Sequence, residues 1–331
     1  MTVDEGIIRL DKLCQEVTGL RSSALLVLYY PDGYGKMLQS DVRDAYSELR
    51  KAGYSKEKKV GKLEILLNTY GGDPTAAYRL AQMIWDFADN LLFLVPEHAY
   101  SAGTLTCFAG NEIRLGDFAG LSPIDITVTE GGSPEEEGVE LTSVDYFMDF
   151  AEEARERIER CLQKLGSKNT SSVDSDLLVK MVEQITALTV GKYFRERTLT
   201  GHYAQELLDT YMFKGVPNSR DRRNRVIRGL LFKAPSHEFH LDYHLAKNMD
   251  LEVKEMSVDE SDLTKSIVSL LRDLTKGGVI CQNLSDFLKM PFIRFYPISV
   301  SATKGGENGD GNDKGKKDKG TRNTKETSGD V

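Results

Sequence analysis

The stretch LLNTYGGDPTAAYRLAQMI, residues 66–84, decides the fold. Its first residues belong to the segment 62–69, which is mostly apolar and has the length and composition of a buried β-strand. After two consecutive glycines, apolar residues recur at positions 77, 80, 81, 84 and 87, which is the spacing of one face of an α-helix. The stretch therefore predicts a strand that turns directly into a helix, as in the repeating unit of a parallel sheet.

The same alternation continues on both sides of this stretch. Strands are predicted at residues 23–30, 91–95 and 112–115, and helices at residues 40–53 and 102–110. A βαβαβ order forms a parallel sheet through right-handed crossovers, with helices on both of its faces. We therefore expect an α/β fold.

Residues 143–190 are predicted to form a helical insertion after this core. An acidic loop over residues 128–140, rich in glutamate and glycine, leads into it. Two amphipathic helices follow, at residues 143–165 and 175–190, and Gly191 is expected to end the second.

Beyond the insertion, the sequence predicts further core elements and then a segment that is poor in apolar residues. Further elements are expected as a helix at 204–209, a strand at 238–243, a helix with a Ser-x-x-Glu capping box at 257–274, and a strand at 291–298. From residue 301 to 331 the chain is mostly Gly, Lys, Asp, Asn and Thr, so it cannot bury enough apolar surface to offset its ordering entropy. We expect a disordered tail there and, at the other end, an N-terminal helix within residues 1–20.

The overall charge argues against a nucleic-acid partner. Lys and Arg number 43 and Asp and Glu number 51 among 331 residues, which gives a formal net charge of −8 at pH 7. A chain of that sign has no general electrostatic attraction for a phosphate backbone. No nucleic-acid binding is therefore expected.

Cysteine usage and hydropathy bear on the compartment. The cysteines at positions 14, 107, 161 and 281 form no Cys-x-x-Cys pair, which argues against a zinc ribbon, a thioredoxin-type motif and a dense disulfide framework. The start of the chain is acidic where a signal peptide is basic, and no apolar run approaches the roughly 18–20 residues of a membrane span. We expect a cytoplasmic protein without a membrane span, and the amphipathic N-terminal helix leaves contact with a membrane surface open.

Two loops have the residue types of a catalytic site. Asn68 to Pro74 and Tyr100 to Thr104 each follow a predicted strand and enter a predicted helix, whose first N–H groups and dipole favour negative charge. Gly71 and Gly72 let the backbone approach a ligand and point an N–H group at it, while Ser101 places a hydroxyl at a helix start. Taken singly, a Gly-Gly turn is usually only a turn and such a serine is usually only an N-cap.

The order and spacing of these loops resemble a known family. The segments LLNTYGGDPTAAYRLAQMI, LLFLVPEHAYSAGT and NEIRLGDFAGLSPIDIT are similar to the Clp/crotonase superfamily, and within it to the serine dehydrogenase proteinase family, related to the SppA signal peptide peptidases. The resemblance covers about residues 23–127, and Tyr70 departs from it where such loops often carry proline. It implies a ββα superhelix fold for residues 21–300.

The same resemblance implies a serine peptidase that assembles as a homo-oligomer and acts on a peptide or protein substrate. Ser101 would be the nucleophile, and the N–H groups of Gly71 or Gly72 and of Ala102 would stabilise the oxyanion. Two alternatives stay open: acyl-CoA chemistry of the crotonase type, which needs no nucleophile, and a scaffold that has lost its base. Neither a metal nor a nucleotide cofactor is expected, since the sequence has no Walker-type GxxxxGK[ST] stretch.

The general base is the least defined part of this prediction. Clp-type enzymes use a histidine and SppA-type enzymes a lysine, and the chain has no histidine between His98 and His202. A lysine is therefore favoured: Lys180 first, because it precedes a Gly-basic pair as in related peptidases, and Lys164 second. Each could equally decorate a solvated helix face. His98 is expected to pack in its loop or to lie at the surface.

Two further residues are expected to support the site. Asp125, in the Ser-Pro-Ile-Asp segment, would line the pocket or orient the base, or would serve only as a turn or cap residue. Thr104 would hold the serine loop by hydrogen bonding, a role that the first turn of a helix often gives to threonine.

Two other motifs invite functional interpretations that we disfavour. His237, His240 and His244 have a spacing that could bind zinc on a continuous helix, but the pattern around them predicts a strand before a helix, which would separate the ligands. Five arginines between positions 220 and 228 form a local basic patch, for which ion pairing is favoured over nucleic-acid binding because no aromatic stacking platform accompanies them.

Overall fold

The computed structural model describes residues 3–32, 35–125, 128–130, 139–141, 160, 187–234, 236–237, 239–276 and 291–298. All of them belong to one compact unit, Met1–Ser299. The predicted tail, Lys164, Lys180 and nearly all of the predicted helical insertion lie outside the described residues.

The core of this unit is a six-stranded sheet. Its strands lie in the order β10 (Phe292–Tyr296), β1 (Ala24–Tyr29), β2 (Val60–Asn68), β3 (Ala88–Val95), β5 (Glu112–Leu115) and β9 (Val253–Glu255). Neighbours from β1 to β9 pair in parallel, and β10 pairs antiparallel with β1 at one edge. The predicted α/β fold with a mostly parallel sheet is confirmed.

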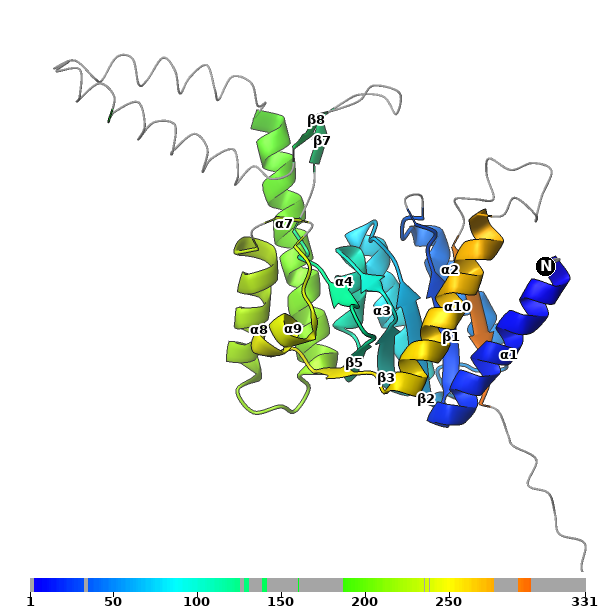
Figure 1. The fold of residues 1–331 in the computed structure, drawn as a ribbon. Coiled ribbons are helices and arrows are strands. Elements are labelled where there is room, and N and C mark those ends of the chain that lie inside the picture. The colour runs from blue at the N-terminus through cyan, green and yellow to red at the C-terminus, as the bar shows by residue number, and fades with distance from the viewer. Residues whose placement is uncertain are drawn as a thin grey trace, which may run out of the picture. The chain divides into compact units, whose positions relative to one another are not determined.

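Helices cover both faces of this sheet (Figure 1). On one face, α1 (Val3–Arg21) and α10 (Val258–Lys276) lie side by side; on the other lie α2 (Gln39–Lys51) and α3 (Pro74–Phe87). Side chains of β1 alternate between these layers, since Leu26 and Leu28 belong to the larger core cluster whereas Leu25 and Val27 pack with α1 and α10. A strand that is buried on both faces explains the continuous apolar run at residues 23–30.

The sequence signals for helix ends are largely confirmed. Asp73 caps α3 by accepting the Thr75 N–H at 2.8 Å, and Pro74 takes the first helical position. Ser257 and Glu260 form the predicted capping box of α10, with the Ser257 N–H donating to Glu260 Oε2 at 2.9 Å. At α2 the capping side chain is that of Asp41, which accepts the Leu38 N–H.

Two predicted helix boundaries, at residues 191 and 204, are wrong. Helix α7 (Ala187–Leu207) passes through Gly191 and ends much later, where it continues as a π-helix, η1 (Leu208–Met212). A Cβ atom added to this glycine would meet no described residue within 4 Å, so no described contact forces the helix to stop there. The predicted helix at 204–209 is therefore the end of a much longer one.

The predicted strand at 238–243 is also wrong. In place of a strand, Leu241 makes a single antiparallel bridge with Leu121, and α9 (Tyr243–Asn248) follows at once, capped by Asp242. Between α7 and this bridge lie α8 (Ser219–Ile227) and a second π-helix, η2 (Arg228–Phe232).

Four short strands lie outside the six-stranded sheet. β4 (His98–Ala99) and β6 (Gly120–Leu121) pair in parallel, and β7 (Val128–Glu130) pairs antiparallel with β8 (Val139–Leu141). The predicted acidic loop at 128–140 thus begins and ends in strands, and its middle lies outside the described residues.

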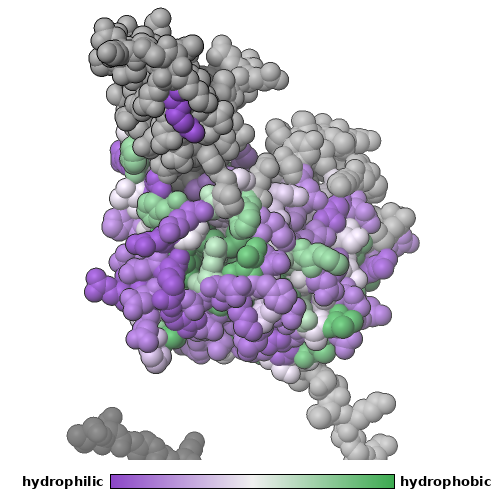
Figure 2. Space-filling view, turned by 60° about the vertical axis from the view of Figure 1, so that its left-hand side comes forward, coloured by the Kyte–Doolittle hydropathy of each residue, from purple (hydrophilic) through white to green (hydrophobic). Residues whose placement is uncertain are grey.

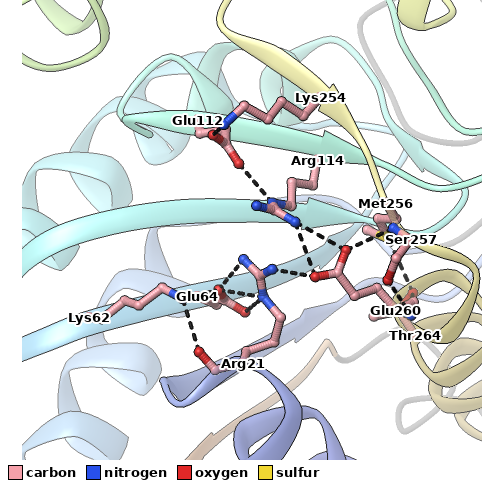
Figure 3. Close-up of polar contacts among 10 residues, drawn as sticks. All are labelled: Arg21, Lys62, Glu64, Glu112, Arg114, Lys254, Met256, Ser257, Glu260 and Thr264. Carbon is pink, nitrogen blue, oxygen red and sulfur yellow. Dashed lines mark hydrogen bonds and ion pairs between the residues drawn. The ribbon is translucent and has the colours of Figure 1, made fainter.

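A network of buried charges ties α1, the sheet and α10 together (Figure 3). Arg21 pairs with Glu64 of β2 at 2.6 Å and also with Glu260 of α10. Arg114 of β5 joins the same Glu260 carboxylate at 3.1 Å and pairs with Glu112 at 2.7 Å. Because Glu64 is fully buried and Arg21 nearly so, each charge depends on its partners for solvation.

The outer surface mixes hydrophilic and apolar side chains. Figure 2 shows the side of the molecule on which α7 and α8 lie. Apolar residues gather in the middle of this face, and hydrophilic residues surround them. None of the helices in the described part of the chain has the combined length and apolar character that crossing a membrane requires.

Candidate active site

The two predicted loops lie against each other at the carboxyl ends of β2 and β3. The Thr69 N–H donates to the His98 carbonyl at 3.0 Å, and the Tyr100 N–H donates to the Thr69 carbonyl at 3.0 Å. A Cβ atom added to Gly71 would lie 2.8 Å from the Cβ atom of Ser101. The structure therefore places the glycine pair and the serine in direct contact.

Both glycines are required by their surroundings. Gly71 and Gly72 have φ angles of +114° and +149°, which side chains disfavour. Any Cβ on Gly72 would also overlap the backbone of Met37, which forms a parallel bridge with this glycine. In that bridge, the Met37 N–H donates to the Gly71 carbonyl at 2.9 Å, and the Asp73 N–H donates to the Met37 carbonyl at 3.0 Å.

The hydrogen bonds of the loops decide which N–H groups can bind an oxyanion. The Gly71 N–H donates to Thr69 Oγ1 at 3.0 Å, so it is occupied. The N–H groups of Gly72 and Ala102 have no acceptor among the residues that the structure describes. Of the two glycines named from the sequence, Gly72 is thus the available donor, together with Ala102.

Ser101 adopts a backbone conformation that is rare for a residue with a side chain. Its φ and ψ angles are +51° and −115°, and such a conformation costs of order 1–3 kcal/mol. Ser101 occupies the N-cap position of α4 (Ala102–Cys107), yet its side chain makes no capping hydrogen bond. The interpretation of this serine as an ordinary N-cap is therefore wrong, and its hydroxyl bonds to no described residue.

Ser122 and Thr104 hold the serine loop in place. The Ser101 N–H donates to Ser122 Oγ at 2.7 Å, and the Ser122 N–H donates to Thr104 Oγ1 at 3.0 Å. Thr104 in turn donates to the Ala99 carbonyl at 2.7 Å. Thr104 therefore has the contacts expected of a support residue, and Ser122, which the sequence analysis did not single out, shares the role.

Aromatic side chains flank the loops. The Tyr70 ring packs against the His98 ring at 4.0 Å between centroids. His98 is buried in this packing and lies within 3.3 Å of Asn68 and 3.8 Å of Asp32. Burial lowers the pKa of His98 despite the nearby carboxylates of Asp32 and Glu97. Loop packing, one of the two roles expected for His98, is the one observed.

Asp125 is paired with a histidine far away in the sequence. His237 Nδ1 lies 2.6 Å from Asp125 Oδ1, and both side chains are mostly buried. The bridge between Leu121 and Leu241 brings the two segments together, with backbone hydrogen bonds of 2.9 Å in both directions. Lys180 and Lys164, the bases expected from the sequence, lie outside the described residues.

The other two histidines of the disfavoured zinc motif are separated from this pair. His240 Nδ1 lies 2.9 Å from the Tyr100 hydroxyl, whereas His244 lies on α9. The described residues contain no group of three or more His, Cys, Asp or Glu side chains that could hold a metal ion.

Ion pairs account for three of the five arginines between 220 and 228. Arg222 pairs with Glu252 at 2.8 Å, Arg225 with Asp250 at 2.5 Å, and Arg223 with Asp209. Arg222 also packs over the ring of Phe213. Much of the basic patch therefore fastens α8 to its neighbours.

Comparison with solved structures finds a distant similarity to a protease. A serine-to-alanine variant of the 1510-N membrane-bound stomatin-specific protease matches with 16% identity and a TM-score of 0.27, over 48% of this chain and 72% of that chain. A lysine-to-alanine variant of the same protease, in complex with a substrate peptide, matches with 14% identity and a TM-score of 0.27, over 70% of this chain and 94% of that chain.

No family model matches this chain. No curated protein matches it either. The fold assignment therefore rests on the strand order and pairing of the chain itself.

Proposed function

We propose that this chain is a serine peptidase of the Clp/crotonase type, with Ser101 as its nucleophile. One observation carries the proposal: Ser101, with a strained backbone and a hydroxyl that bonds to no described residue, lies against Gly71, and the next residue after each of them, Ala102 and Gly72, has an N–H group with no acceptor among the described residues. A strained backbone persists only where surrounding contacts hold it, and such residues cluster at functional sites. An oxyanion hole needs two such donors beside the nucleophile.

The proposed reaction uses these groups as follows. Ser101 Oγ attacks the peptide carbonyl carbon and gives its proton to the base, and the N–H groups of Gly72 and Ala102 stabilise the negative charge on the carbonyl oxygen. Collapse of the intermediate breaks the C–N bond, and the base protonates the departing amine. Water then hydrolyses the ester on Ser101 by the same two steps, which restores the serine.

Two kinds of base are candidates: a lysine, which is Lys180 or after it Lys164, and a histidine. Lys180 remains the first choice because of the family resemblance, and its position lies outside the described residues. The pair formed by Asp125 and His237 is the second, since a carboxylate that binds Nδ1 orients an imidazole to accept a proton at Nε2. Variants of Lys180 and His237 distinguish the two.

A non-catalytic scaffold is the competing function. The observation that favours it concerns the base: no described side chain that could take the proton is hydrogen-bonded to the Ser101 hydroxyl. Acyl-CoA chemistry of the crotonase type has less support, because it would leave the strained Ser101 backbone without a purpose. Homo-oligomeric assembly and a cytoplasmic location remain proposals that follow from the family resemblance and the sequence.

Hydrolysis of a quenched fluorescent peptide library by the full-length chain tests the function. The proposal expects turnover that Ser101→Ala abolishes and Ser266→Ala leaves unchanged, because Ser266 is an exposed serine on α10. Absence of turnover in the wild-type chain, or equal turnover in Ser101→Ala, would contradict it.

A further inference from the structure

A pocket lies beyond the serine loop, between the turn that joins β5 to β6 and the start of α9. It has a volume of about 460 Å³ and is lined by residues 115–119, 240, 242–244 and 255. One wall is His240, whose Nδ1 atom lies 2.9 Å from the hydroxyl of Tyr100, the residue before Ser101. This hydrogen bond therefore links the wall of the pocket to the serine loop.

Carboxylates are the charged side chains that line the pocket. Of the described residues that line it, Asp117, Asp242 and Glu255 are acidic and none is Lys or Arg. Asp117 is already paired with Lys265 at 3.2 Å. Among the described residues, the Asp242 carboxylate accepts the Leu245 N–H alone, and Glu255 is exposed and makes no ion pair with any described residue.

Phe118 supplies an aromatic face at the same place. Its side chain is 97% exposed, and its backbone has a φ angle of +61°. It occupies the third position of a turn closed by the Ala119 N–H and the Gly116 carbonyl at 3.0 Å, where glycine would be unstrained. Folding alone therefore gives no reason for an exposed phenyl group here, whereas a cation held over an aromatic ring does.

We propose that this pocket binds the arginine or lysine side chain of a polypeptide, with the cation between Phe118 and the carboxylates of Asp242 and Glu255. A guanidinium group suits such a site because it stacks on aromatic rings and pairs with carboxylates. The proposal rests on the proposed function in one respect: if Ser101 cleaves peptides, the bound residue belongs to the substrate and sets its specificity.

Binding can be measured without catalysis. Fluorescence anisotropy of the full-length Ser101→Ala chain would compare a fluorescein-labelled heptapeptide that contains one arginine with the same peptide carrying citrulline, its neutral isostere. We expect the arginine peptide to bind at least about tenfold more tightly. Equal binding of the two peptides would overturn the proposal, whatever the outcome of the hydrolysis assay.

Three variants in the Ser101→Ala background and one matched control locate the site. Phe118→Gly, Glu255→Gln and Asp242→Asn should each reduce the preference for arginine severalfold, and Asp262→Asn, which removes an exposed charge elsewhere, should not. Phe118→Gly also relieves backbone strain, so it should keep or raise the melting temperature while it weakens binding. Asparagine is as good an N-cap as aspartate, so Asp242→Asn keeps α9 capped.

Free agmatine provides the last arm of the experiment. The proposal expects agmatine to compete weakly, because the peptide backbone contributes to binding. Agmatine that binds as tightly as the peptide would assign the pocket to small amines, and an arginine preference that survives both Phe118→Gly and Glu255→Gln would place the cation site elsewhere. Either result would overturn the proposal.

Discussion

The Ser101 N–H donates to Ser122 Oγ at 2.7 Å. This bond joins the strained residue at the start of α4 to the Ser-Pro-Ile-Asp segment that follows β6. Ser122 is 1% exposed, and its own hydroxyl donates to the Pro123 carbonyl at 3.0 Å, so its orientation is fixed. The backbone conformation that presents the Ser101 hydroxyl therefore depends on a side chain 21 residues away.

Ser122→Ala should lower kcat of the proposed peptidase by at least about tenfold with little change in KM, because the Ser101 loop loses the bond that holds its φ angle. Steady-state kinetics on a fluorogenic peptide would measure the split between the two constants. Ser122→Thr, which keeps the hydroxyl, should restore most of the rate. A loss in Ser122→Ala that appears only in KM would argue against a positioning role.

Gly72→Ala should destabilise the fold by about 3 kcal/mol or more, since the added methyl group overlaps the Met37 backbone and the φ angle is unfavourable. Gly191→Ala is the matched control, because Gly191 lies inside α7 with open space around it. The control should stabilise the protein by roughly 0.5–1 kcal/mol. Urea denaturation measures both, and equal effects of the two substitutions would refute the assigned roles.

Glu260→Gln should cost about 2 kcal/mol at neutral pH, because Arg21 and Arg114 each lose a buried carboxylate partner and keep only Glu64 and Glu112, respectively (Figure 3). Asp259→Asn, a neighbouring exposed residue of α10, is the control and should change the free energy of unfolding little. Comparable losses in the two variants would show that the network contributes no more than a surface charge.

The same network predicts how stability depends on pH. Burial raises the pKa of Glu260, but the Ser257 N–H and the guanidinium groups of Arg21 and Arg114 outweigh it, so the pKa lies below the ordinary value. A carboxylate with a depressed folded-state pKa stabilises the protein above its unfolded pKa, and this stability is lost as the pH falls. Burial raises the pKa of Asp41, so this carboxyl group makes the protein relatively more stable as the pH falls.

The free energy of unfolding should accordingly decrease as the pH falls from about 5 to about 3, and the decrease should be smaller in Glu260→Gln. Denaturation at a series of pH values measures this slope. If the free energy of unfolding falls as steeply with pH in Glu260→Gln as in the wild-type chain, Glu260 does not cause the pH dependence.

Lys180→Ala should abolish peptide hydrolysis if the lysine is the base, whereas His237→Gln should keep at least about a tenth of the rate. Lys164→Ala tests the second lysine candidate in the same predicted insertion, and it should keep the rate if Lys180 is the base. The reverse pattern, with activity lost in His237→Gln and retained in Lys180→Ala, would assign the base to the pair formed by Asp125 and His237.

Local signals in the sequence predict most of the core elements. The apolar runs give β1, β2 and β3, and the paired glycines with Asp73 and Pro74 fix the turn into α3. The capping box at Ser257 and Glu260 locates the start of α10. These features succeed because strand burial and helix capping depend on neighbouring residues.

Features that depend on distant contacts could not be predicted in this way. Asp125 and His237 are 112 residues apart and meet through the bridge between Leu121 and Leu241. Ser122 gives no local sign of its bond to Ser101. At Gly191 a local signal misleads. The glycine predicts the end of a helix, but α7 continues through it because the flanking residues are helical.

The most direct test of the central claim is labelling of the full-length chain with a fluorophosphonate probe, followed by peptide mass spectrometry. An activated nucleophile predicts stoichiometric modification of Ser101, lost in Ser101→Ala and retained in Ser266→Ala. Folded protein that shows no modification of Ser101 would contradict the claim and would favour the scaffold.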